Sequence, residues 1–336
     1  MKLYLAKVIR GERLTEEEAG AAMATIMQGE ATPAQIGGLL AALAVRGETE
    51  DEVVGFARTM RARALPLSAR GAVDTCGTGG DGAGTFNIST VASLVVAACG
   101  VPVAKHGNRS ASGSCGSADV LEALGLRIDA APAVVQRSLD EAGWAFLFAP
   151  AFHAATRHAV GPRKELGVRT AFNLLGPLTN PALPEAQVVG VPRPELTAFI
   201  ARCLQRLGVR RAWVVHGSGL DELSLCGPTT VAAFGGDEDG GGVRTFTVTP
   251  EDAGLAPCGP ESLRGGDAAA SAAIAGDVLR GGRGPRRDVV VLNAAAVLVV
   301  AGRAAGLKEG AVQAAQAIDE GRAARLLGRV RELSRS

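Results

Sequence analysis

The chain has 336 residues, 47% of them hydrophobic, so it can hold one large domain or two and bury a sizeable core. Its net charge of +1 is dispersed along the chain, which argues against a protein that binds nucleic acid through bulk positive charge. No apolar run reaches 18 residues, and the stretch 289–301 is interrupted by Asn293, so the sequence also excludes a membrane span.

The six cysteines form neither a C-x-x-C pair nor a pattern with metal-ligand spacing. The first residues soon turn polar and do not resemble a signal peptide, so we expect reduced thiols and a cytoplasmic protein. We therefore expect no nucleic-acid partner and no membrane partner.

Capping boxes predict a helical unit over residues 1–65. Each box opens a segment whose apolar residues recur at helical spacing, and the boxes begin at Thr15, Thr32 and Thr49. Three short helices bury little core by themselves. We expect this unit to pack against the rest of the chain or against a second subunit.

A glycine-rich stretch from Asp74 to Thr90 follows the expected end of a buried strand at Val73 and precedes a helix expected at 91–98. Glycines let backbone N–H groups approach a ligand closely, and a helix N-terminus adds partial positive charge. The stretch therefore predicts an anion site. It lacks the Gly-Lys-Ser/Thr of a Walker loop and does not fit G-x-G-x-x-G. A mobile linker is the weaker alternative, because linkers seldom carry Asp, Asn, Ser and Thr at such a junction.

After residue 71, alternating strand and helix patterns predict a mostly parallel α/β sheet. Further strands are expected at 101–104, 144–148 and 212–216, with an antiparallel pair at 229–234 and 243–248 around a flexible loop at 235–242. Helices are expected at 117–124, 132–142, 194–207, 267–279, 288–301 and 310–333.

Four polar clusters follow the expected strands, and ligands of open parallel sheets bind at the carboxyl ends of strands. They are the glycine stretch and residues 105–117, 149–169 and 216–224. Their convergence predicts an active site.

Lys105 can neutralise a phosphate as a point charge, and Ser117 opens a second helix N-terminus. Asp221 and Glu222 are adjacent on a turn and offer the oxygen ligands that Mg²⁺ prefers. Alone, the pair could equally be the acidic start of a helix. Opposite a phosphate loop, metal binding is the better interpretation.

Positive charge gathers between residues 149 and 170, where an arginine could bind a planar carboxylate, although most of it could belong to a solvated helix face. The charged residues are Arg157, His158, Arg163, Lys164 and Arg169. No Ser/His/Asp order or Cys–His pair stands out. The sequence therefore favours a reaction without a covalent nucleophile.

Together these motifs resemble anthranilate phosphoribosyltransferase over nearly the whole chain. They are D-T-C-G-T-G-G-D at 74–81, N-I-S-T at 87–90, K-H-G-N-R at 105–109, G-S-A-D-V-L-E at 116–122, R-K-E-L-G-V-R-T at 163–170, F-N-L-L-G-P-L-T-N-P at 172–181 and G-L-D-E-L-S at 219–224. The resemblance implies transfer of phosphoribose from 5-phosphoribosyl 1-diphosphate (PRPP) to the amine of anthranilate, with release of pyrophosphate, in tryptophan biosynthesis.

The resemblance also implies a fold and an assembly. Residues 1–65 would form a small helical domain, joined by a helical segment near 163–182. Residues 71–336 would form a larger α/β domain with a mostly parallel central sheet, of the nucleoside phosphorylase type. We expect a homodimer formed through the helical domain, with two Mg²⁺ ions per subunit.

By match to the family's motifs, PRPP would be held by Gly77, Gly80, Asp81, Thr85, Asn87, Ile88, Ser89, Thr90, Lys105, His106, Gly107, Asn108, Arg109 and Ser117. Anthranilate would contact Gly77, His106, Asn108 and Arg163. The metal ligands would be Ser89, Asp221 and Glu222. No residue is assigned to acid–base or covalent catalysis, because positioning and electrostatics can supply most of the acceleration, with Lys105 in support.

The chain departs from the family's usual pattern in several places: H-A-A-T at 153–156 in place of H-P-A-M, Gly113 in place of a serine, a shorter loop at 216–219, and Cys115. We expect the first to alter the shape of the anthranilate channel and the second to remove one hydroxyl. Neither change affects Lys105 or the expected metal carboxylates.

Two alternatives remain open from the sequence. A pyrimidine nucleoside phosphorylase would share the fold, but the paired Asp221 and Glu222 and the Asn108 and Arg163 set argue against it. A non-catalytic relative that binds nucleic acid would need a continuous basic groove, which the balanced charge disfavours.

Overall fold

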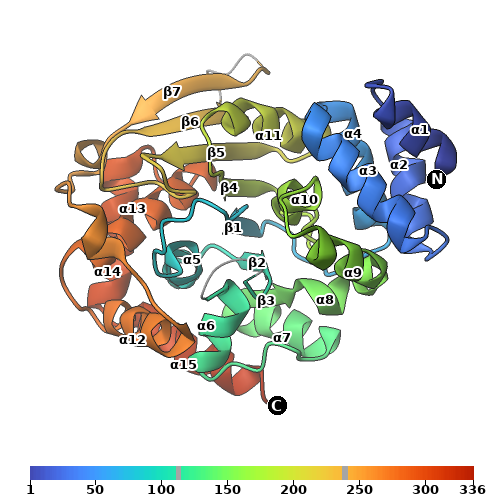
Figure 1. Ribbon diagram of the computed structural model, residues 1–336. Helices are drawn as coiled ribbons and strands as arrows, with labels where there is room; N and C mark the ends of the chain where they lie inside the picture. The colour runs from blue at the N-terminus through green and yellow to red at the C-terminus, as the bar shows by residue number, and fades with distance from the viewer. Residues whose placement is uncertain (111–114, 237–240) are drawn as a thin grey trace.

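The computed structural model describes residues 1–110, 115–236 and 241–336. A small N-terminal helical domain lies beside a larger α/β domain built on one central sheet (Figure 1), which confirms the predicted fold class. Within the described ranges, no helix is both long and apolar enough to cross a membrane. Gly113 and the centre of the loop expected at 235–242 lie outside the described residues.

The N-terminal domain consists of the helices α1 (Lys2–Ile9), α2 (Glu16–Met27), α3 (Pro33–Arg46) and α4 (Glu50–Ala62). All three predicted capping boxes form. In each, a backbone N–H donates to the threonine hydroxyl three residues earlier, at 3.2 to 3.3 Å. Most of the apolar residues between the caps face inward, and Ile36, Leu39 and Leu43 are almost fully buried.

The sheet has seven strands in the order β3-β2-β1-β4-β5-β6-β7. They are β1 (Val73–Gly77), β2 (Val103–Gly107), β3 (Trp144–Phe148), β4 (Ala186–Gly190), β5 (Arg211–Gly217), β6 (Thr229–Phe234) and β7 (Arg244–Val248). Neighbours from β3 to β5 pair in parallel, whereas β6 and β7 are antiparallel, as predicted. The carboxyl ends of the parallel strands therefore share one edge of the sheet.

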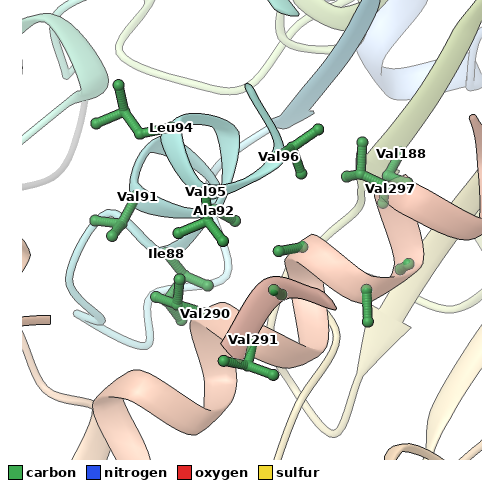
Figure 2. Packing of buried hydrophobic residues seen from close by; sticks show 14 of the residues in the cluster. Ile88, Val91, Ala92, Leu94, Val95, Val96, Val188, Val290, Val291 and Val297 are labelled. Carbon is green, nitrogen blue, oxygen red and sulfur yellow. The ribbon is translucent and has the colours of Figure 1, made fainter. Parts of the chain in front are cut away.

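The two faces of the sheet contribute to different cores, because successive side chains of a strand point to opposite faces. On one face, Val188 and Val215 join a core with α5 (Ile88–Ala98) and α13 (Pro285–Val300). On the other, Val189 and Val214 join a core with α11 (Glu195–Arg206) and the N-terminal helices. Figure 2 shows α5 packed against α13, an arrangement that fixes the α5 N-terminus at the sheet edge.

The helices α9 (Arg157–Leu166) and α10 (Phe172–Leu178) link the two domains. The first packs on α2 and α3, and the second packs on α4 and β2. Arg61 of α4 reinforces this join, because its Nε donates to the Leu178 carbonyl at 2.7 Å and its Nη1 to the Leu207 carbonyl at 2.9 Å.

The remaining helices surround the sheet. They are α6 (Ser117–Ala123), α7 (Pro132–Ala142), α8 (Ala149–Phe152), α12 (Ala268–Leu279), α14 (Leu307–Asp319) and α15 (Arg322–Leu333), with short 3-10 turns at Ala154–Thr156, Pro250–Ala253 and Pro260–Leu263.

Several element predictions were wrong. The first two strands begin and end later than expected, so Lys105 lies inside β2 and does not follow it. The helix expected at 310–333 is two helices, separated by Gly321 with φ +70°, a conformation that ends a helix. The central strand β4 was not predicted, because it is short and carries the polar Gln187, whose side chain is buried and donates to the Pro177 carbonyl at 3.1 Å.

Candidate active site

The glycine loop, defined here as residues 78–86, connects β1 to α5 at the carboxyl edge of the sheet. Gly79, Gly80, Gly82 and Gly84 all have positive φ, between +64° and +84°. In the described part of the chain, the backbone N–H groups of Gly80, Asp81 and Gly82 donate no hydrogen bond. Unpaired N–H groups beside a helix N-terminus are the donors that an anion needs.

Two carboxylates from the turn after β5 contact this loop and the start of α5. Asp221 Oδ2 accepts from the Gly79 N–H at 2.7 Å, and Glu222 Oε1 accepts from the Ser89 N–H at 3.0 Å. The Asp221 N–H in turn donates to Asp81 Oδ2 at 3.3 Å. The structure thus brings together the predicted phosphate loop and the predicted metal carboxylates.

Glycines at the ends of β1 and β4 allow this close approach. A Cβ added at Gly77 would lie 2.2 Å from Asp221 Oδ2, and one added at Gly190 would lie 1.5 Å from the Asp221 carbonyl oxygen. Gly190 was not identified from the sequence, since it lies on the unpredicted strand β4. Asn293 of α13 also holds this turn in place, because it exchanges two hydrogen bonds with the backbone of Leu223, at 2.9 and 3.0 Å.

The two carboxylates lack sufficient counter-charge. Burial, and then the charge of Asp81, raises the pKa of Asp221 to about 7, and burial, and then Asp221, raises the pKa of Glu222 to about 8. A hard divalent cation would offset this repulsion. Among the described residues, no group of three or more His, Cys, Asp or Glu side chains converges on one point. Further ligands would therefore come from a hydroxyl such as that of Ser89, from water or from substrate oxygens.

Lys105 points from β2 toward the start of α5. It is 1% exposed, and its Nζ donates to the Thr75 carbonyl at 2.6 Å and to Ser89 Oγ at 3.4 Å. Beneath it, Asp74 is fully buried and accepts from Asn180 Nδ2 at 2.8 Å, and burial raises the pKa of this carboxyl. A buried ammonium beside Ser89 places positive charge near the anion donors.

His106 and His153 form a buried pair, with ring centroids 5.2 Å apart. His106 Nδ1 lies 3.0 Å from the Gly176 carbonyl, so this nitrogen carries the proton and Nε2 is left as an acceptor. Burial lowers the pKa of His106 to about 3 and also lowers that of His153. Both rings are therefore neutral at pH 7. His153 was not assigned to the site from the sequence.

The residues after β2 meet the start of α6. Asn108 accepts at its carbonyl from Ser117 Oγ at 3.2 Å, and a Cβ added at Gly107 would lie 2.3 Å from that hydroxyl. Arg109 is exposed and turns toward α6, where it pairs with Asp119 at 2.8 Å and Glu122 at 2.9 Å. Arg109, which was predicted to contact PRPP, therefore forms ion pairs with two carboxylates of its own chain.

The start of α5 combines core and site residues. The side chain of Ile88 is fully buried against α13 (Figure 2), which leaves only its main chain for a ligand. Thr90 is also buried, and Asn87 Nδ2 donates to the Cys115 carbonyl at 3.3 Å. Thr85 forms an isolated bridge with Arg264, which closes the far side of the loop.

The two arginines of the 163–170 motif lie in different surroundings. Arg163 of α9 stacks on the Phe172 ring, 4.8 Å from its centroid, and burial lowers its pKa. Within the described residues, no carboxylate pairs with it. Arg169 instead reaches the glycine loop, where its Nη1 donates to the Gly79 carbonyl at 2.8 Å. No pattern in the sequence separated Arg169 from the other cations of this segment.

Comparisons with known proteins cover almost the whole chain. The helical bundle domain of a glycosyl transferase family matches residues 2–64, and the α/β domain of a glycosyl transferase family matches residues 69–324. The chain is 56% identical over 327 residues to the anthranilate phosphoribosyltransferase of Moorella thermoacetica, covering 96% of this chain and 95% of that one. It is 56% identical over 332 residues to that of Paramagnetospirillum magneticum, covering 98% and 95%.

Solved structures agree. The crystal structure of anthranilate phosphoribosyltransferase from Thermus thermophilus is 47% identical, with a TM-score of 0.93 over 99% of each chain. The enzyme from Saccharomyces cerevisiae in complex with PRPP and Mg is 26% identical, with a TM-score of 0.89 over 99% of this chain and 97% of that one.

Proposed function

Because this chain belongs to the anthranilate phosphoribosyltransferases, we propose that the residues gathered on the glycine loop carry its reaction. The enzyme transfers the phosphoribosyl group of PRPP to anthranilate in tryptophan biosynthesis and releases pyrophosphate. The observation that supports the assignment of residues is the contact of Asp221 and Glu222 with the N–H groups of Gly79 and Ser89.

PRPP lies along the glycine loop in this proposal. The unpaired N–H groups of Gly80, Asp81 and Gly82 and the N-terminus of α5 face its negative charge, and Lys105 adds a buried cation. The remaining contacts are those predicted by match: Gly77, Thr85, Asn87, Ile88, Ser89, Thr90, His106, Gly107, Asn108, Arg109 and Ser117. For Arg109 to contribute, its pairing with α6 has to be exchanged for the ligand.

Asp221, Glu222 and Ser89 would hold Mg²⁺, with two ions per subunit. The donor set fits, because all three offer hard oxygen atoms and the carboxylates are short of counter-charge. When bound, the metal supplies neutralisation of the departing pyrophosphate charge. A relative was solved in complex with PRPP and Mg, which supports the same requirement here.

Anthranilate would be bound between Arg163, Asn108, Gly77 and His106. An arginine suits the planar carboxylate of the substrate. The neutral His106 Nε2 offers an acceptor to the N–H of an aromatic amine, so it orients the nucleophile without removing a proton beforehand. The ribose carbon then passes through a cation-like state, and positioning supplies much of the acceleration.

We further propose that residues 1–65, with the segment near 163–182, act as the helical domain and 71–336 as the PRPP-binding domain, and that the helical domain forms a homodimer. Leu3 and Ile9 of α1 and Val45 of α3 support this, because they are apolar and 83%, 67% and 90% exposed. Light scattering after size exclusion tests the dimer. A monomer at micromolar concentration would contradict it.

The activity is tested by the loss of anthranilate fluorescence on adding the protein, PRPP and Mg²⁺. We expect loss only when all three are present, and its absence after addition of a chelator. Phosphorolysis of thymidine or uridine without PRPP turnover would point instead to a nucleoside phosphorylase.

A further inference from the structure

One residue of the glycine loop, Gly79, is held from two sides. Its N–H donates to Asp221 Oδ2 at 2.7 Å, and its carbonyl accepts from Arg169 Nη1 at 2.8 Å. Gly80 provides the room for this guanidinium, since a Cβ added there would lie 1.4 Å from Nη1. Asp81 and Asp221 also attract Arg169 electrostatically, whereas Arg193 repels it.

The contact on the Gly79 carbonyl orients the next N–H group. In a trans peptide the carbonyl of one residue and the N–H of the next point in opposite directions, and the structure has no cis peptide bond among the described residues. Arg169 therefore turns the Gly80 N–H away from itself. That N–H has no acceptor within the described ranges.

Arg169 belongs to the short segment 167–171 between α9 and α10. Because α9 packs on α2 and α3 and α10 packs on both α4 and β2, this segment lies where the helical domain meets the sheet. It also follows Arg163, the proposed anthranilate contact, by six residues on the same stretch.

We infer that Arg169 is a positioning residue that orients the Gly80 N–H of the glycine loop for the diphosphate of PRPP. The inference rests on the proposed PRPP site. Arg169 acts through the Gly79–Gly80 peptide and does not bind anthranilate, which separates its role from that of Arg163.

Substrate dependence gives the first test. Arg169→Ala should raise the KM for PRPP about tenfold, the effect of one lost charge-assisted hydrogen bond, and leave the KM for anthranilate within about twofold. Arg169→Lys, which keeps the charge, should recover part of the loss. Arg157→Ala, an exposed arginine at the start of α9, should leave both constants unchanged. A KM for PRPP within about twofold of the wild-type value, or an equal rise in the KM values for both substrates, would overturn the inference.

A double-mutant cycle gives the second test, read as the affinity for PRPP with Mg²⁺ by calorimetry. Gly80→Ala should strain the backbone, because φ is +84° there, and should also displace Arg169. In the Arg169→Ala background only the strain remains, so the loss of PRPP affinity caused by Gly80→Ala should be at least about threefold smaller than in the wild-type background. Gly82→Ala is the matched control, because Gly82 has φ +70° but open space around its Cα. Its effect should be the same in both backgrounds. An equal effect of Gly80→Ala in both would refute the contact's role.

The outcomes separate this inference from the proposed site. If the loop glycine variants leave PRPP affinity unchanged, the PRPP site itself is misassigned. If they weaken it and Arg169→Ala does not, only the inference about Arg169 is lost.

Discussion

Replacing Gly190 by alanine changes no group proposed to touch a ligand, yet it should disable the enzyme. The added Cβ would lie 1.5 Å from the Asp221 carbonyl oxygen, and this neighbour is backbone. Since carbon needs about 3.5 Å to a non-bonded neighbour, the turn has to retreat by about 2 Å. A displacement of about 1 Å in an active site can reduce the rate about 100-fold. We therefore expect kcat/KM to fall by at least about 100-fold.

The assay is anthranilate fluorescence at several Mg²⁺ concentrations, with thermal unfolding measured in parallel. Overpacking should lower the stability of the Gly190→Ala variant by about 1–3 kcal/mol, which need not unfold the protein. Gly77→Ala should lower the stability less, because its Cβ would meet the movable end of the Asp221 side chain at 2.2 Å.

The matched control is Gly328→Ala on α15, where an added Cβ meets nothing within 4 Å. This variant should keep full activity and gain up to about 1 kcal/mol of stability from the better helix former. A folded Gly190→Ala enzyme within about threefold of wild-type kcat/KM would refute the idea that this contact positions the carboxylates.

Three further predictions concern the site. Asp221→Asn combined with Glu222→Gln should abolish Mg²⁺-dependent turnover without lowering the melting temperature; turnover at the wild-type rate would remove the metal assignment. Arg163→Ala should raise the KM for anthranilate more than that for PRPP, and steady-state kinetics with the reverse order would reject its role. His106 binds a proton more weakly in the folded protein than in the unfolded chain, because burial lowers its pKa from 6.5 to about 3. Stability should therefore fall as pH drops below 6.5, by about 2 kcal/mol from this group at pH 5. The free energy of unfolding of the His106→Asn variant, measured with urea, should not show this part of the decrease at low pH.

Local signals accounted for three helices of the N-terminal domain and for the glycine loop. Thr15, Thr32 and Thr49 predicted three helix starts because a capping box is complete within four residues. The strand ends were misplaced, because Asp74 and Lys105 are buried polar residues inside parallel strands, and alternation of apolar and polar residues does not reveal them.

Features that depend on distant parts of the chain were not predictable. Gly190 is important because the turn at Asp221 passes over it, and Arg169 is distinguished from Arg157 by its contact with Gly79. Each of these facts is set by how strands and helices pack, and no spacing within the sequence encodes it. Asn293 belongs to the same class, since its partner Leu223 lies 70 residues away.

The bonds from Asp221 to the Gly79 N–H and from Glu222 to the Ser89 N–H have a consequence for selectivity. At these two positions the N–H groups already have acceptors in the protein's own acids, so an anion that used them would have to displace Asp221 and Glu222. Inorganic phosphate arriving alone would take these hydrogen bonds from both acids and bring no metal ion in exchange. A diphosphate sugar that carried magnesium would give both acids a new partner in the same event, and this would favour it over phosphate at these two amides.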